Sequence, residues 1–268
     1  GVSRVHAAMA RTSEDGSITV EPFQLGSTGP DLPALVALSP EGEWHFGDQA
    51  AAIGSSRPQN LLTGLRRRIG DDVPFMVDGH KILAEDAYAR LAVTVIELVT
   101  QSEGARPAHV TLTYPADWGF FRVTLVQDAL GTRYSGAFEL IPEAEAAARG
   151  TTHTVDKNKA LAVYDLGATT FDTAILRRKP IPWSDFDAWT ILDETTGIPI
   201  GGMNFDDAIV RHVISSLDSA EEISGASLVA LRGECAGAKE VLSLETRVEI
   251  PVRGADGPTN VPVSRTEF

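Results

Sequence analysis

The chain has 268 residues, a formal net charge of -14 at pH 7 and one cysteine, Cys235. This acidity argues against nucleic acid or an anionic membrane surface as a main partner. One cysteine rules out an intramolecular disulfide framework and a cysteine-based zinc site, and no apolar run reaches the ~20 residues of a membrane-spanning helix. The size predicts two domains or lobes, and the cysteine content fits a cytoplasmic or otherwise reducing compartment.

Apolar periodicity and turn residues predict a mixed α/β fold in the first half of the chain. Strands are expected there at residues 3–10, 17–23, 35–38, 44–46, 109–114 and 138–141. Helices are expected at residues 84–100, 119–130 and 143–149. The longest helix repeats apolar residues on one face, at Tyr88, Leu91, Val95 and Leu98.

The second half begins after a polar segment at residues 151–159, which predicts a surface crossing between the two lobes. Strands are expected in a hairpin over residues 163–176, and then at 189–192, 248–252 and 261–263. Helices are expected at residues 204–217 and 228–243. The first of these repeats apolar residues every four positions, at Phe205, Ile209, Val213 and Leu217. This spacing predicts one buried face.

The hairpin at residues 163–176 is the most informative segment. A turn of small residues separates its strands, and Asp165 and Asp172 stand at the two edges of that turn. The small residues Gly167, Ala168 and Thr169 allow backbone N–H groups to approach an anion closely. Because carboxylates do not bind phosphate directly, the pair suggests a metal ion such as Mg²⁺ between them and a phosphate. The same sequence also fits an ordinary hairpin turn.

Several further motifs follow one another along the chain. They occupy residues 1–3, 44–51, 60–70, 110–116, 140–148, 165–172, 201–206 (Gly-Gly-Met-Asn-Phe-Asp) and 235–243. Each motif is weak alone. In this order, the run resembles the nucleotide-binding domain of the Hsp70 chaperone family, within the actin-like ATPase superfamily, and the resemblance covers nearly the whole chain.

The resemblance implies an α/β fold of two lobes around a cleft that binds ATP or ADP with Mg²⁺. The first lobe would span residues 1–157, with its core at 1–32 and 105–157 and an inserted subdomain at 33–104. The second would span 158–268, with its core at 158–217 and the start of an inserted subdomain at 218–268. By the same resemblance, the chain enters just after the aspartate of the first phosphate loop and ends before the family's second adenosine motif, so its second lobe would be incomplete.

The resemblance also implies roles for single residues. Asp165 and Asp172 would flank hydrated Mg²⁺ and hold it mainly through water, and Thr170 would place its hydroxyl near the γ-phosphate. Glu143 would orient the attacking water, and Pro115 would relay the nucleotide state outward. The remaining contacts to the nucleotide would come from Val2, Ser3, Gly167, Ala168, Thr169, Gly201, Gly202, Lys239 and Ser243.

Two departures from the family pattern concern the nucleotide. Arg66 stands where the family has its catalytic lysine, although the run Arg66-Arg67-Arg68 also fits a solvated surface and the register could slip by one. The resemblance implies that the helix at residues 235–243 contacts adenosine. In that helix, Glu240 stands where the family has an arginine that stacks on adenine, and Ala236 stands where it has a carboxylate for the ribose. Together these losses should cost about 2–4 kcal/mol. They predict weak nucleotide binding, slow turnover, or both.

These features favour an Hsp70-like ATPase with slow Mg²⁺-dependent hydrolysis, coupled to a chaperone-like or partner-binding segment outside the chain. The first alternative is a degenerate, non-hydrolysing nucleotide sensor or interaction scaffold on the same fold. The second is an actin-like filament or cell-division protein. The Gly-Asp-x-Ala motif at residues 47–50 and the helix start near Asp206 favour the Hsp70 branch over the second alternative.

Overall fold

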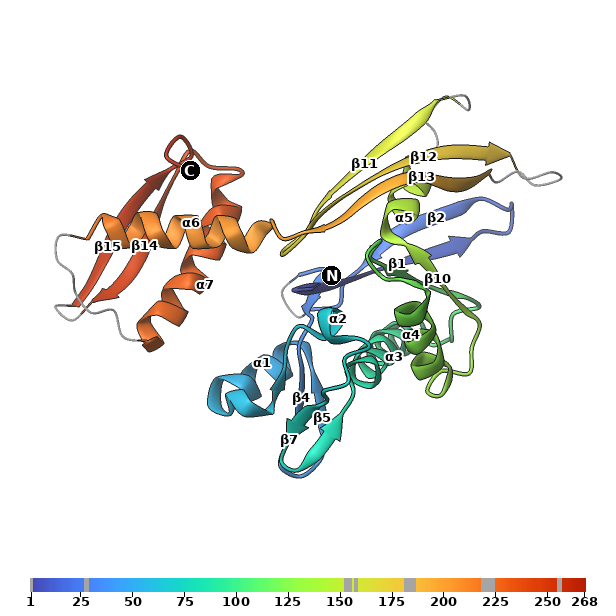
Figure 1. Ribbon diagram of the computed structural model, residues 1–268, viewed down its shortest axis with the longest axis horizontal. Coiled ribbons are helices and arrows are strands. Elements are labelled where there is room, and N and C mark those ends of the chain that lie inside the picture. The colour runs from blue at the N-terminus through green and yellow to red at the C-terminus, as the bar shows by residue number, and fades with distance from the viewer. Residues whose placement is uncertain are drawn as a thin grey trace. The chain divides into compact units, whose positions relative to one another are not determined.

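A computed structural model describes residues 2–26, 29–151, 156, 159–180, 187–217, 225–254 and 257–268 (Figure 1). The chain divides into two compact units, which we describe separately. Unit 1 contains Gly1–Asp165 and Asp172–Gly197, and unit 2 contains Leu166–Phe171 and Ile198–Phe268. The expected lobe boundary between residues 157 and 158, with most of the segment at 151–159, lies outside the described residues. The lobe and subdomain boundaries therefore stay predictions.

The first unit is a mixture of small sheets and helices. Its strands are β1 (Arg4–Thr12), β2 (Ile18–Phe23), β3 (Asp31–Pro33), β4 (Val36–Leu38), β5 (Trp44–Phe46), β6 (Leu61–Leu62), β7 (Phe75–Val77), β8 (His80–Ile82), β9 (Val110–Tyr114), β10 (Phe138–Pro142), β11 (Ala160–Leu166), β12 (Phe171–Pro180) and β13 (Asp187–Ile198). Its helices are α1 (Gly47–Ser56), α2 (Leu65–Arg68), α3 (Ala84–Glu103), α4 (Phe120–Gly131) and α5 (Glu143–Gly150), with a 3-10 turn at Pro58–Asn60.

Hydrogen bonds join these strands into several small sheets. The neighbours are β2-β1-β3, β5-β4-β6, β7-β8, β10-β9 and β11-β12-β13. The pair β9 and β10 is parallel, whereas the pairs in β2-β1-β3 are antiparallel. The sheet β11-β12-β13 is the one that carries the predicted metal and phosphate residues.

The buried clusters of unit 1 show which helices cover its sheets. One buried cluster lies beneath α3 and includes Leu32, Val36, Leu62 and Leu91. A second joins α5 to the sheet β11-β12-β13 through Ala144, Ala148, Ala174, Leu176 and Trp189. The residues Leu161 and Val163 of β11 pack against this second cluster. Helix α5 therefore covers the face of the sheet to which alternate residues of β11 and β12 point.

The second unit consists of α6 (Gly202–Ser215), α7 (Gly225–Leu242), β14 (Arg247–Gly254) and β15 (Gly257–Ser264). The two strands form an antiparallel hairpin, with Ile250 opposite Val261 and Val248 opposite Val263. Helix α6 packs against α7 and α7 against β14 (Figure 1). The common core contains Ile209, Val213, Leu231, Cys235, Leu242, Ile250 and Val263.

Each strand and helix expected from the sequence is present, with ends that shift by a few residues, and the α/β class is confirmed. The prediction for Phe205 is wrong. It was placed on the buried face of its helix with Ile209 and Val213, but it is 37% exposed. The elements α1, α2, β3, β6, β7 and β8 were missed. Most of them are too short to show a period, and α1 buries only Gly47 and Ala50.

Within the described part of the chain, no helix combines the length and the apolar character that crossing a bilayer requires.

Candidate phosphate and nucleobase site

The turn between β11 and β12 is docked on the start of α6. Within the turn, the N–H of Gly167 donates to the carbonyl of Thr170 at 2.8 Å. The carbonyl of Gly167 accepts from the N–H of Gly202 at 3.0 Å, and the carbonyl of Ala168 accepts from the N–H of Met203 at 2.8 Å. The first N–H groups of α6 are thus bonded to the turn, so they are not free to bind an anion themselves.

These bonds fix the direction of two peptide groups. No peptide bond of the described chain is cis, and in a trans peptide the N–H points opposite to the C=O. Because the carbonyls of Gly167 and Ala168 both point toward the start of α6, the N–H groups of Ala168 and Thr169 both point away from it. Two successive N–H groups directed to one side form a concavity that favours an anion.

Gly201 makes this docking possible. A Cβ atom at Gly201 would lie 2.5 Å from the carbonyl carbon of Ala168 and 2.5 Å from the nitrogen of Thr169. Its φ of -163° is extended and open to any residue, so the requirement is close approach and not conformation. A Cβ atom at Gly202 would have the Nζ atom of Lys239 as its nearest neighbour, at 3.2 Å, and the closest backbone atoms at 3.8 and 3.9 Å. The structure therefore excludes a side chain at Gly201 more strictly than at Gly202.

Asp165 and Asp172 lie opposite each other. Strands β11 and β12 are neighbours, and the hydrogen bond between Gly167 and Thr170 closes the hairpin between them. Counting two residues back from Gly167 and two residues forward from Thr170 places Asp165 opposite Asp172. Facing residues of an antiparallel pair have Cβ atoms about 4.5–5.5 Å apart. One carboxylate oxygen of Asp172 accepts a bond from the N–H of Gly197 at 2.6 Å. Two facing carboxylates repel each other unless a cation lies between them.

This pair fits Mg²⁺ better than a cation that needs a full protein cage. Among the described residues, no group of three or more His, Cys, Asp and Glu side chains could hold a metal ion. Mg²⁺ in phosphate sites uses one or two carboxylates and takes its other ligands from water and phosphate oxygens. In the turn itself, the buried hydroxyl of Thr169 has no hydrogen-bond partner among the described residues. The donor set is thus consistent with a metal ion that arrives with a phosphate ligand.

Arg66 and Glu143 form an ion pair. The Nη2 atom of Arg66 donates to Oε1 of Glu143 at 2.8 Å, although 77 residues separate them. The side chains are 10% and 24% exposed. The alternative of a solvated arginine surface is therefore wrong for Arg66, whereas Arg67 is exposed. Glu143 is the first residue of α5, the helix that covers the sheet carrying Asp165 and Asp172.

Tyr88, which interacts with both charges of this ion pair, belongs to a group of aromatic side chains. The rings of Tyr88 and Trp118 meet edge to face at 5.8 Å, and Tyr114 stacks on Trp118 at 6.3 Å. Burial raises the pKa of the Tyr88 hydroxyl, and the nearby Glu143 carboxylate raises it further, against the opposing charge of Arg66. The pair thus lies beside poorly solvated groups, where a charge interaction is stronger than at an open surface.

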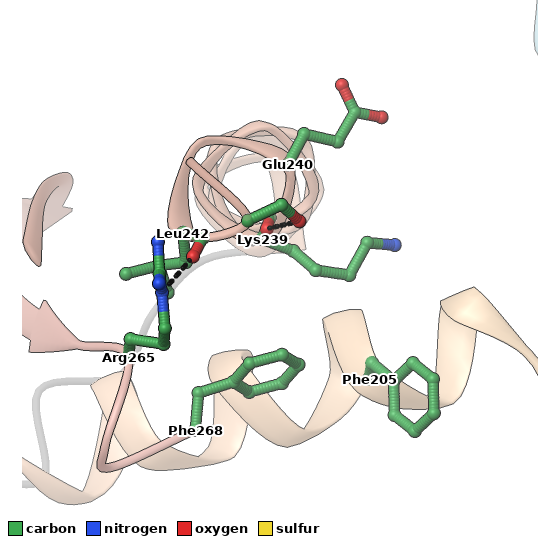
Figure 2. Close-up of a pocket in the computed structure, with 7 residues that line it drawn as sticks. Phe205, Lys239, Glu240, Leu242, Arg265 and Phe268 are labelled. Atoms are coloured by element: carbon green, nitrogen blue, oxygen red, sulfur yellow. Dashed lines mark hydrogen bonds between the residues drawn. The ribbon is translucent and has the colours of Figure 1, made fainter. Parts of the chain in front are cut away.

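Lys239 connects the two helices of unit 2. Its Nζ atom lies 2.6 Å from Oδ1 of Asp206 and donates to the carbonyl of Gly202 at 3.1 Å. The hydroxyl of Ser243 donates within the helix to the carbonyl of Lys239, at 3.4 Å. Beside them lies a pocket of about 440 Å³ (Figure 2). Its lining residues are Phe205, Lys239, Glu240, Leu242, Ser243, Arg265 and Phe268.

Comparison with known proteins agrees with this set of motifs. Residues 140–268 match the family model described as "Hsp70 protein". Over 265 residues, the chain is 24% identical to "Chaperone protein DnaK" of Elusimicrobium minutum (strain Pei191), covering 94% of this chain and 42% of the relative. It is 22% identical over 268 residues to "Chaperone protein DnaK" of Endomicrobium trichonymphae, covering 96% of this chain and 42% of that relative. Along nearly its whole length the chain is thus similar to Hsp70 proteins, at low identity. It spans 42% of the length of these relatives.

The expected site residues fall into groups within the two units. Unit 1 brings together Arg66 with Glu143 and Asp165 with Asp172. Unit 2 brings the turn at residues 167–170 to Gly201 and Gly202, with Lys239 beside them. The first-loop residues Val2 and Ser3 precede β1, where the carbonyl of Ser3 accepts a bond from the N–H of Ala34. Their proposed contact with nucleotide stays a prediction, as do the other assigned roles.

Three residues that the structure places near Lys239 were not assigned from the sequence. Asp206 was noted only as part of a helix start, although it pairs with Lys239. Phe205 and Arg265 line the pocket. The sequence could have indicated Phe205 and Asp206, because both lie about one helical turn after the start of α6. Arg265 follows β15 and carries no local signal.

Proposed function

We propose that this chain is an Hsp70-type nucleotide-binding domain that binds ATP and ADP together with Mg²⁺. The observation that carries the proposal is the docked turn at residues 167–170. Its carbonyls are bonded to α6, and its N–H groups at Ala168 and Thr169 point away from that helix. The facing carboxylates of Asp165 and Asp172 flank the same turn. Backbone donors beside a carboxylate pair are the combination that a phosphate with its metal ion requires.

The roles of the other residues follow from their chemistry. When bound, Mg²⁺ supplies positive charge that neutralises phosphate oxygens during transfer. Asp165 and Asp172 would hold that ion mainly through water, and the hydroxyl of Thr170 would bond to the terminal phosphate. Glu143 would orient the attacking water by accepting its proton in a hydrogen bond. Arg66 would supply charge to the phosphate, as a planar fork instead of the point charge of a lysine.

The ion pair between Arg66 and Glu143 supports slow hydrolysis. A carboxylate that accepts a bond from a guanidinium is a weaker acceptor for water, because part of its negative charge is already neutralised. For the same reason, the pair supports a second candidate function, a nucleotide sensor that binds without hydrolysis. Both candidates share the phosphate site and differ only in turnover.

We further infer that the nucleotide state controls the binding of a protein partner or client in the cytoplasm. The two relatives are named as chaperone proteins, and the chain corresponds to 42% of their length. The net charge of -14 supports a protein partner over nucleic acid.

Calorimetric titration of ATP and ADP, each with and without Mg²⁺, tests the proposal. Asp165→Asn should weaken Mg²⁺-dependent binding, and Asp193→Asn is the matched control because Asp193 is an exposed aspartate on strand β13 of the same sheet. Phosphate release measured on the same samples separates the candidates. Slow release abolished by Asp165→Asn supports the ATPase, and binding without release supports the sensor. No binding of either nucleotide at millimolar concentration contradicts both.

A further inference from the structure

Unit 1 has a pocket of its own between strand β5 and helix α3. Its volume of about 430 Å³ falls in the range of small-molecule sites. Trp44 and Phe46 line it, and because they are two residues apart in β5 they lie on one side of the strand. Helix α3 contributes the side chains at positions 90, 93, 94 and 97, whose spacing places them on one face of the helix. Arg133, which follows α4, completes the lining.

This face of α3 differs from the one that meets the proposed catalytic residues. The charges of Arg66 and Glu143 act on Tyr88, which lies two positions before Arg90 in the same helix. Two positions correspond to about 200° around an α-helix. The pocket is therefore separate from the Arg66–Glu143 pair.

Two arginines of the pocket share a single carboxylate. Nε of Arg90 donates to Oδ2 of Asp86 at 3.3 Å, and Nη2 of Arg133 donates to Oδ1 of the same aspartate. Two positive charges thus meet one negative charge, and one positive charge is left over. Nε of Arg133 is also buried, and it has no hydrogen-bond partner among the described residues. The arginines can therefore accept one further anionic group.

The guanidinium of Arg90 is held in a fixed position. Its Cζ atom lies 4.4 Å from the centre of the Trp44 ring, and its Nε is bonded to Asp86. Its two Nη groups lie at the other end, and neither donates to any described residue. Two N–H groups in such a planar fork match the two oxygens of a carboxylate.

A negative charge lines the same pocket two helical turns after Arg90. Glu97 is exposed, and no cation among the described residues forms an ion pair with it. The apolar side chains of Phe46 and Val93 also line the pocket. A few convergent polar groups on an apolar lining are typical of a site for a small molecule. Here the polar groups offer one uncompensated charge of each sign.

From this arrangement we propose that the pocket binds a free α-amino acid with an apolar side chain, independently of the proposed function. Arg90 and Arg133 receive the α-carboxylate, and Glu97 receives the α-ammonium. The side chain of the amino acid lies against Phe46 and Val93. A zwitterion supplies one charge of each sign, so it complements the pocket where a simple anion or cation would leave one protein charge unpaired.

The test compares three probes by calorimetric titration into the chain: L-leucine, 4-methylpentanoate and 3-methylbutylamine. The second probe is leucine without its ammonium, and the third is leucine without its carboxylate. Each should bind roughly 10- to 100-fold more weakly than leucine, because each lacks one hydrogen-bonded charge. Equal Kd values for leucine and 4-methylpentanoate would show a simple carboxylate site and overturn the inference. No binding of leucine at millimolar concentration also overturns it.

Variants locate the binding. Glu97→Gln alters an exposed side chain and should weaken leucine binding about tenfold without weakening that of 4-methylpentanoate. Glu14→Gln is the matched control, since Glu14 is an exposed glutamate in the turn between β1 and β2. Arg90→Lys keeps the charge but loses the fork, and it should weaken both probes that carry a carboxylate. Circular dichroism shows whether Arg90→Lys is folded, and if it is not, Glu97→Gln decides. Leucine affinity that is unchanged in Glu97→Gln overturns the inference.

Trp44 provides a second readout of the same site. Leucine should change the tryptophan fluorescence of the chain, and Trp44→Phe should abolish that change. A change that persists in Trp44→Phe would place the ligand elsewhere and overturn the inference. These titrations contain no nucleotide, so their failure leaves the proposed function standing.

Discussion

Replacing Gly201 by alanine should displace the phosphate turn. The new Cβ atom would lie 2.5 Å from both the carbonyl carbon of Ala168 and the nitrogen of Thr169, and both are backbone atoms. Carbon atoms in comfortable contact are about 3.5–4.0 Å apart, so the turn and the start of α6 must separate by about 1 Å. Overpacking of this kind costs about 1–3 kcal/mol. For a chain of this size, that corresponds to a fall in Tm of roughly 3–10 °C.

Gly202→Ala is the matched control for this prediction. Its Cβ atom would meet the end of the flexible Lys239 side chain at 3.2 Å, and that side chain can move. We therefore expect Gly202→Ala to leave the Tm nearly unchanged.

Thermal unfolding and ATP titration of both variants give the decisive comparison. A shift of about 1 Å in the N–H groups of Ala168 and Thr169 should weaken ATP binding at least tenfold, because hydrogen bonds to charged groups contribute about 1.5–3 kcal/mol each. Gly201→Ala should therefore lose both stability and affinity, and each loss should be larger than in Gly202→Ala, whose Cβ atom displaces only the end of Lys239. Equal Tm and equal Kd values for the two variants would refute the close-approach argument.

Two further predictions concern buried groups. Arg66→Met leaves the Glu143 carboxylate half-buried without its partner and should lower the free energy of unfolding by about 1–3 kcal/mol. A double-mutant cycle with Glu143→Leu in urea measures the coupling, and a coupling near zero contradicts the ion pair. Burial raises the pKa of the Cys235 thiol to about 11, so at pH 8 only roughly one thiol in a thousand is the reactive thiolate. A thiol reagent should label Cys235 slowly in the native chain, faster as the pH rises toward 11 and at once in urea; rapid native labelling at pH 7 would argue against burial.

The sequence predicts those parts of the fold that have a period or a strong stop signal. Helix α3 illustrates this, because its apolar stripe is regular and Gly104 ends it at a φ of +69°. Helix α1 could not be predicted, since Gly47 and Ala50 are its buried residues and show no stripe. The structure favours glycine at position 47 because its φ is +58° and a Cβ atom there would lie 2.2 Å from a methyl group of Leu32, a contact that only the folded chain reveals.

In the candidate site, too, the sequence predicts what depends on neighbouring residues and does not predict contacts between residues far apart in the chain. The turn and its flanking aspartates are visible in the sequence, because all of them lie within eight residues of Asp165. The partner of Arg66 is not, because Glu143 is 77 residues away and any carboxylate could have met the arginine. The pairing of Lys239 with Asp206 depends on how α6 packs against α7, which no spacing along the chain encodes.

The two halves of the proposed nucleotide site differ in what holds the ligand, and this explains where the chain diverges. The phosphate half uses backbone N–H groups at Ala168 and Thr169, which survive any side-chain change that preserves the docking at Gly201. The base half depends on side chains, so substitutions at Ala236 and Glu240 alter it directly. A chain at 24% identity to one relative and 22% to another can therefore keep a phosphate site while its base contacts change. On this reasoning, affinity for the triphosphate should be the property that the chain keeps, and the substitutions at Ala236 and Glu240 should weaken the contribution of the base.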